Sequence, residues 1–166
     1  GASAVALRRH GDGTTLRQVT TMARTTTEEF DATLAPDQRA VIERAKAFAA
    51  QVVAPAAEDW ETRAHYPIDA MRAACAEGLA AIEVPRSHGG LGMPFSVRLR
   101  VAEEFARHDF AFGFALINHH NAMARIADSG SPEAVERYLS RMMRGEIIGA
   151  SALSEPGAGS DFAEIG

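Results

Sequence analysis

Cysteine, lysine and long apolar runs are all scarce in this sequence of 166 residues. The single cysteine, Cys75, excludes an internal disulfide and fits a reducing compartment. It lies among alanines in a helical pattern, so we interpret it as a small buried hydrophobic side chain and not as a nucleophile. Lys46 is the only lysine, so arginine carries nearly all the positive charge. No apolar run approaches the roughly 20 residues of a membrane-spanning helix, and no membrane span is predicted.

An excess of positive charge is absent as well. The 17 Lys and Arg residues are outnumbered by 22 Asp and Glu residues, and the formal net charge is −5. Because a protein that binds nucleic acid needs a basic face, we expect no nucleic acid partner. The hydrophobic fraction of 46% and the charged fraction of 23% are typical of a soluble globular protein with one domain.

The first 34 residues differ from the rest. Residues 1–27 contain several arginines and threonines but one acidic residue, Asp12. Such a composition is typical of an organellar transit peptide, but we favour a disordered leader or tail over residues 1–34. The sequence has no initiator methionine, so we expect part of a longer translation product. We expect a cytoplasmic protein, or one of the mitochondrial matrix if the leader is a transit peptide.

Helical patterns follow the leader. Pro36 suits the first turn of a helix, and apolar residues recur after it at 4-3-4 spacing. Gly78 is typical of a helix C-cap and Asp109 of an N-cap, while Ser131 and Pro132 together indicate the start of the last helix. We predict helices over residues 36–60, 68–77, 95–108, 110–127 and 132–145.

The helix over residues 110–127 has apolar side chains around its whole cylinder, so we predict that it is buried. Residues 147–153 are apolar and read as extended. The sequence has no internal repeat and no alternation of strands with helices. The predicted fold class is all-α, with a short extended segment at the C-terminal end.

Hydroxyls, a proline and glycines follow in residues 151–166, which read SALSEPGAGSDFAEIG. Such a segment presents backbone N–H groups and hydroxyl donors at the surface, where a polar ligand can approach closely. Its core, residues 154–161, resembles the flavin-binding signature Thr/Ser-Glu-Pro-Gly-Ala-Gly-Ser-Asp that ends the N-terminal helical domain of the acyl-CoA dehydrogenases. Given the complete string, we favour ligand binding over simple turn chemistry.

Four further segments resemble this family in the same order along the chain. They are the glycine-rich loop over residues 84–92, the sequence EEFAR over residues 103–107, and residues 137–139 and 144–150. The resemblance covers residues 35–161. It implies that residues 35–166 form the N-terminal helical domain of this family, with the middle β-barrel and the C-terminal helical domain outside the chain.

The resemblance implies an FAD-dependent oxidoreductase that catalyses α,β-dehydrogenation of an acyl-CoA thioester. In the family, the threonine that matches Ser154 reaches the polar edge of the isoalloxazine. The family's serine that matches Ser160 contacts the FAD pyrophosphate and lies beside the acyl-CoA path. Hydroxyls and N–H groups freed by glycine suit such an anion. The expected cofactor-binding residues are Ser151, Leu153, Ser154, Gly159 and Ser160, and Ser160 is also expected to bind substrate.

No catalytic residue is expected within the chain. Glu155 lies in the signature, but the family's glutamate at this position is structural, and its catalytic glutamate comes from the C-terminal helical domain. The resemblance therefore implies a fragment of a longer enzyme. The implied partners are an acyl-CoA substrate and an electron-transfer flavoprotein or another acceptor, and the full-length protein is expected to be a homo-oligomer.

One position departs from the family pattern. The family usually has an aromatic residue three positions before the signature hydroxyl, whereas this sequence has Ser151. The change removes a stacking surface near the flavin, so a flavin monooxygenase of the same fold is a second interpretation. A third interpretation, from another class, is a helical interaction module without redox activity.

The histidines offer a competing pattern. His119 and His120 are adjacent, whereas metal ligands on one face of a helix need spacings of three or four residues. We therefore expect no metal site and assign the pair to the core or to the lining of an acyl pocket. His65 is expected to lie in a loop between helices.

Overall fold

The computed structural model describes residues 26–152, 154–157 and 159–160. Its elements in these ranges are helices, and no β-strand occurs among them, so the prediction of an all-α domain is confirmed. Residues 148–152 form no helix, as expected of the extended segment. None of the helices described is long and apolar enough to cross a bilayer. The chain divides into two units, residues 1–33 and residues 34–166.

The first unit contains helix α1 (Thr27–Thr33). Its start is a capping box, in which the Glu29 amide donates to the Thr26 hydroxyl at 3.2 Å and the Thr26 amide donates to the Glu29 carboxylate at 2.7 Å. This helix differs from the predicted leader without structure over residues 1–34, at residues 27–33. Residues 1–25, where the arginines lie, are outside the described residues.

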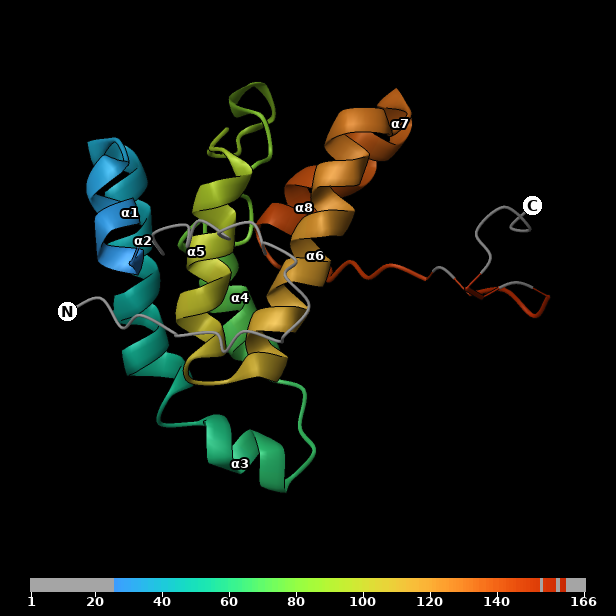
Figure 1. Ribbon diagram of the computed structural model, residues 1–166. Helices are drawn as coiled ribbons and strands as arrows, with labels where there is room; N and C mark the ends of the chain where they lie inside the picture. Colours follow the sequence, from blue (N-terminus) through green and yellow to red (C-terminus); the bar gives the residue numbers. More distant parts are fainter. Residues whose placement is uncertain (1–25, 153, 158, 161–166) are drawn as a thin grey trace, which may run out of the picture. The chain divides into compact units, whose positions relative to one another are not determined.

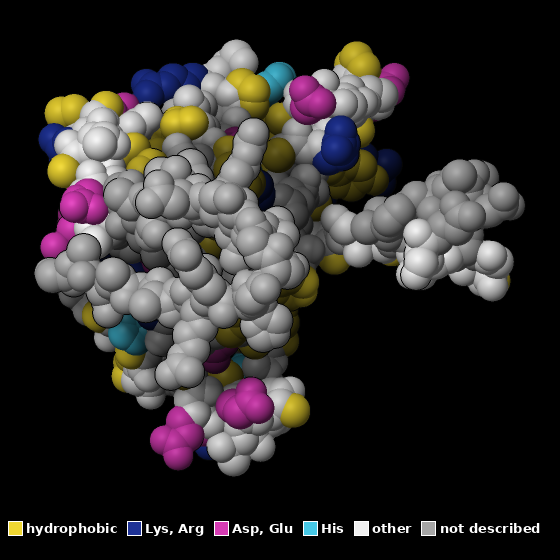
Figure 2. All heavy atoms as spheres, in the orientation of Figure 1, with side chains coloured by type: hydrophobic (Ala, Val, Ile, Leu, Met, Phe, Trp, Pro, Cys, Tyr) yellow, Lys and Arg dark blue, Asp and Glu magenta, His cyan; other side chains and the backbone are white. Residues whose placement is uncertain are grey.

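The second unit begins with helix α2 (Pro36–Phe48), which continues through a π-helical turn (Ala49–Val53) before α3 (Ala57–Thr62). The prediction of one continuous helix over residues 36–60 is therefore wrong at residues 54–56, where the helix is interrupted. Pro55 lies in the break, where it lacks the N–H of a helical residue and its ring crowds the preceding turn. Figure 2 shows acidic side chains over α3, whose first turn carries Glu58 and Asp59.

Helix α4 (Ile68–Ala76) ends where predicted, because Gly78 adopts a φ of +74° and the next amide reaches back to the Ala74 carbonyl at 2.9 Å. The chain then folds back on itself through a short 3₁₀ turn (Arg86–His88). Hydrogen bonds from Leu91 to the Ala81 carbonyl and from Met93 to the Ile82 carbonyl, 3.0 and 2.8 Å long, close this glycine-rich loop.

The remaining elements are α5 (Phe95–Ala106), α6 (Phe110–Ser129), α7 (Pro132–Ala134), a π-helical turn (Val135–Leu139) and α8 (Ser140–Met143). Both predicted N-caps are confirmed. The Asp109 carboxylate accepts from the Phe112 amide at 2.7 Å, and the Ser131 hydroxyl accepts from the Ala134 amide at 3.2 Å. These side chains satisfy N–H groups that have no partner within the helix.

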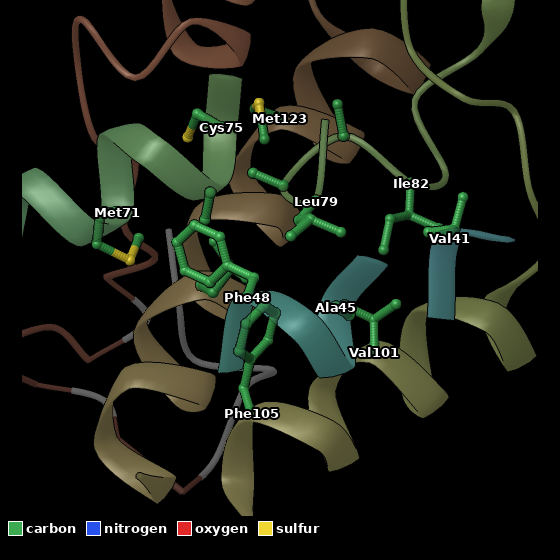
Figure 3. Close-up of a cluster of buried hydrophobic side chains, with 14 of the residues drawn as sticks. Val41, Ala45, Phe48, Met71, Cys75, Leu79, Ile82, Val101, Phe105 and Met123 are labelled. Atoms are coloured by element: carbon green, nitrogen blue, oxygen red, sulfur yellow. The ribbon is translucent and has the colours of Figure 1, made fainter. Parts of the chain in front are cut away.

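In this unit, α5 lies between α2 and α6, and the last helical turns contact α4 and α6 (Figure 1). Apolar side chains from α2, α4, α5 and α6 fill the centre, and Figure 3 shows Phe48 and Phe105 among them. Phe112 joins these two rings at centroid distances of 6.4 and 5.3 Å and stacks on Trp60 at 5.7 Å. Four aromatic rings thus tie α2, α3, α5 and α6 together.

Helix α6 is not buried all around, which corrects the prediction. Phe112 is 1% exposed, whereas Phe110 and Phe114 are 72% and 56% exposed and stack on each other at 6.0 Å. All three are phenylalanines at alternate positions, so hydrophobicity alone could not separate them. The packing of α6 against α5 decides which side faces the core.

Candidate functional site

The signature residues form an exposed arm that follows the helical domain. Ser151, Ser154, Gly159 and Ser160 are all exposed, and the chain turns at Pro156 and the glycine after it. Leu153, the fifth expected cofactor-binding residue, lies outside the described residues.

The arm presents open backbone and exposed hydroxyl groups that can donate hydrogen bonds. A Cβ atom added to Gly157 or Gly159 would meet no atom within 4 Å, so the backbone at both positions is open to a ligand. The exposed hydroxyls of Ser154 and Ser160 lie on either side of these glycines in the sequence and can donate to anionic or carbonyl oxygens. The hydrogen-bond donors of the described residues are therefore chemically compatible with FAD.

The arm leaves the domain at a buried contact with α6. The His119 ring has no exposed surface and lies between two backbone groups: its Nε2 is 3.0 Å from the Met142 carbonyl, and the Gly149 amide donates to its Nδ1 at 2.9 Å. Because a carbonyl only accepts and an amide N–H only donates, the ring is neutral with its proton on Nε2. His119 thus joins α6 to the end of α8 and to the chain that leaves it.

Gly149 approaches α6 so closely that a side chain would not fit. A Cβ at this position would lie 2.3 Å from the Met142 methyl carbon and 2.7 Å from the Ala122 Cβ. The methionine end is flexible, but the alanine Cβ is fixed to the α6 backbone. Glycine is therefore required for the contact that brings its amide to His119.

The neighbouring histidine faces a different part of the fold. His120 Nδ1 lies 2.8 Å from the Ala80 carbonyl and its Nε2 lies 3.2 Å from Glu83 Oε2. Arg98 completes the group, with its Nε 2.5 Å from the same carboxylate oxygen. These contacts join α6 and α5 to the segment before the glycine-rich loop. The two histidines therefore have separate partners. Both are buried in the core, which is one of the two roles predicted for them.

The surroundings lower the pKa of both imidazoles. Burial lowers the pKa of His119, His120 lowers it further, and only the Met142 carbonyl acts in the opposite direction. Burial also lowers the pKa of His120, and the Arg98 charge adds to this, against the Ala80 carbonyl and Glu83. No cluster of three metal-ligating side chains occurs in the described part of the chain.

The EEFAR segment holds buried charge in place. Arg100 pairs with Glu104 at 2.6 Å and with Glu103 at 2.7 Å, and Arg100 and Glu104 are both buried. A buried charge without a partner is costly, so these carboxylates have a structural role in α5. They add no acid or base to the arm.

A hollow that the sequence does not predict lies between α3 and the start of α6. Its volume is about 320 Å³, and Trp60, Phe112 and Tyr66 contribute to its wall. His65, expected in an ordinary loop, lines it as well, and Asp109 lines it while its carboxylate caps α6. No local sequence signal marks this hollow, because residues that lie about 45 positions apart form it.

Comparisons with known proteins agree with this fold. Residues 35–146 match the family described as "Acyl-CoA dehydrogenase, N-terminal domain". The 3-(aryl)acrylate reductase of Clostridium sporogenes is 32% identical over 122 residues, which are 73% of this chain and 32% of that protein. The mitochondrial isovaleryl-CoA dehydrogenase of Solanum tuberosum is 32% identical over 121 residues, 71% of this chain and 29% of that protein.

Solved structures show the same arrangement of helices. An acyl-CoA dehydrogenase from Bacillus anthracis, in complex with FAD, superimposes with a TM-score of 0.71 at 25% identity, over 81% of this chain and 23% of that one. The chain spans about a third of the length of the curated relatives that it matches. With its helical fold and the match over residues 35–146, the chain belongs to the acyl-CoA dehydrogenase family, as the resemblance implied.

Proposed function

We propose that the chain is the N-terminal domain of an FAD-dependent oxidoreductase that dehydrogenates an acyl-CoA thioester between its α and β carbons. The observation that carries the proposal is the exposed arm, whose open glycines and two serine hydroxyls follow directly on a domain of this family. FAD, when bound, supplies the redox chemistry by accepting the hydride from the β-carbon.

The residues of the arm bind and orient in this proposal. The Ser154 hydroxyl donates to the polar edge of the isoalloxazine, with Ser151 and Leu153 beside it. Ser160, with the amide freed by Gly159, binds the pyrophosphate and borders the acyl-CoA path. The catalytic glutamate is supplied from outside these 166 residues. Glu155 is exposed and is assigned no part in proton removal.

The wider assignments follow from the same proposal. Electrons leave to an electron-transfer flavoprotein or to another acceptor, and the protein works as a homo-oligomer. Its compartment is the cytoplasm, or the mitochondrial matrix if residues 1–34 are a transit peptide.

The test uses the protein at its full natural length. We expect it to be purified with bound FAD, and acyl-CoA to bleach the flavin absorbance in the absence of oxygen. The product should be lighter than the substrate by two hydrogen atoms. Ser154→Ala and Ser160→Ala should each weaken FAD binding by about tenfold, which is the value of one hydrogen bond to a charged or polar ligand. Ser140→Ala, at an exposed serine of α8, is the matched control.

Other outcomes separate the remaining interpretations. A product heavier by one oxygen atom would replace dehydrogenation with flavin monooxygenation. A folded protein without affinity for FAD would refute both flavoenzyme proposals and leave the helical interaction module.

A further inference from the structure

We propose that His119 is a positioning residue for the cofactor arm. Its ring fixes the Gly149 amide and thereby the point from which residues 151–160 leave the domain. The inference rests on the proposed function, since it assigns the arm to FAD, but the contact itself is a property of the helical domain.

The contact lies at the right place to act on the arm. After α8, the Glu146 amide still bonds back to the Arg141 carbonyl at 2.9 Å, and Ile147 and Ile148 pack against the core. The next backbone hydrogen bond that the structure shows is the 2.9 Å bond from the Gly149 amide to His119. Ser154 lies five positions after Gly149, which limits the distance between them to roughly 17 Å. An anchored Gly149 therefore restricts the volume that the Ser154 hydroxyl can visit.

Burial makes the anchor strong and directional. The ring is fully buried, and both of its nitrogens are used, one on α8 and one on the departing chain. Losing the Nδ1 acceptor would leave a half-buried amide without its partner, which costs more than an exposed hydrogen bond does. The Gly149 backbone also runs close to α6, since a Cβ added there would lie 2.7 Å from the Ala122 Cβ.

An arm held in advance binds its ligand more tightly. A flexible segment must lose conformational entropy when it binds, whereas an anchored one has lost part of it on folding. Replacing the anchor should therefore weaken FAD binding although the buried His119 is assigned no contact with FAD. A residue with a purely structural role would lower stability without this selective effect.

The adjacent histidine provides a matched control. Gln places a polar nitrogen near the position of Nε2 but nothing at Nδ1. His119→Gln therefore keeps the contact with Met142 and loses the one with Gly149, whereas His120→Gln keeps the contact with Glu83 and loses the one with Ala80. Both variants lose one buried hydrogen bond of an imidazole, but only His119→Gln loses a hydrogen bond to the chain that leads into the arm. His119→Asn places an oxygen at the position of Nδ1 and should restore the acceptor.

Hydrogen exchange measured by mass spectrometry on the full-length protein gives a readout independent of activity. For residues 146–152 we expect exchange about tenfold faster in His119→Gln than in the wild type, since one buried hydrogen bond corresponds to about that factor. His120→Gln and His119→Asn should exchange like the wild type in this segment. Gly149→Ala, which disturbs the contact from the other side, should resemble His119→Gln.

FAD affinity, measured on the same proteins, completes the test. We expect the dissociation constant to rise about tenfold in His119→Gln and to stay within about twofold of the wild type in His120→Gln and His119→Asn. Equal exchange in the two glutamine variants would overturn the inference, and so would faster exchange with unchanged FAD affinity. If His119→Gln does not fold, loss of protection in a folded His119→Asn variant would overturn it. A wild-type protein that binds no FAD would refute the proposed function, and the exchange contrast would then decide the anchor alone.

Discussion

Phe112→Ala should destabilise the helical domain far more than Phe114→Ala, although the two phenylalanines are two residues apart on α6. Phe112 is 1% exposed and contacts the rings of Trp60, Phe48 and Phe105 at 5.7, 6.4 and 5.3 Å. Truncating a buried phenylalanine to alanine costs about 3–5 kcal/mol through lost transfer free energy and the remaining cavity. Aromatic pairs contribute about 0.5–1.5 kcal/mol each, so the loss should lie near the upper end, at about 5 kcal/mol.

Phe114 provides the control on the same helix. It is 56% exposed and stacks on Phe110, which is itself 72% exposed. Only part of its surface is removed from water, so its truncation should cost about 1 kcal/mol or less. The two substitutions have the same chemistry and change helix propensity equally, so the difference between them measures tertiary packing.

Urea unfolding of the 166-residue chain, followed by fluorescence, would measure both free energies. Trp60 is the only tryptophan and lies in the affected ring cluster, so the signal reports on this part of the core. A domain is stable by about 5–15 kcal/mol, and the Phe112→Ala variant could be too unstable to fold. Phe112→Leu, with an expected loss of about 1.5 kcal/mol, then serves instead. Equal losses for Phe112→Ala and Phe114→Ala would refute the packing of α6 described above.

Three further predictions follow from buried groups and from a helix cap. Burial is the main reason that the pKa values of His119 and His120 are lowered in the folded chain. The unfolded chain therefore binds protons at a higher pH than the folded chain does. The free energy of unfolding should have its full value above about pH 6.5 and decrease as the pH drops below that value. Urea titrations between pH 5 and 8 in which the free energy of unfolding increased toward acid would contradict this. Burial raises the pKa of Cys75 to about 11, so alkylation at pH 8 should be about 100-fold slower than in urea; a rate equal to that in urea would exclude a buried thiol. Asp109→Ala removes the cap of α6 and should cost about 1 kcal/mol in urea unfolding, whereas Asp128→Ala, at an exposed residue, should cost less than half of that.

The ends of the helices were predictable from the sequence. The caps at Asp109 and Ser131 and the glycine at Gly78 each involve a few neighbouring residues, so the signal and its structure lie close together in the chain. The break near Pro55 also has a local cause in the sequence. The apolar spacing around it predicted a continuous helix, but the proline interrupts the helix.

The candidate site could be predicted only in part. The hydroxyls and glycines of residues 151–160 are visible in the sequence because one continuous segment carries them. Whether they bind FAD stays a prediction. The anchor of that segment was missed, because His119 is 30 residues away from Gly149 and nothing in the residues around either position indicates the other.

The sequence by itself determined the helical class, the family and most helix ends, because periodicity and capping operate over a few residues. Tertiary structure alone decided which phenylalanine of α6 is buried, which two backbone groups the His119 ring joins, and where a hollow opens beside Trp60. These features depend on contacts between residues far apart in the chain, and such contacts exist only once the helices have packed.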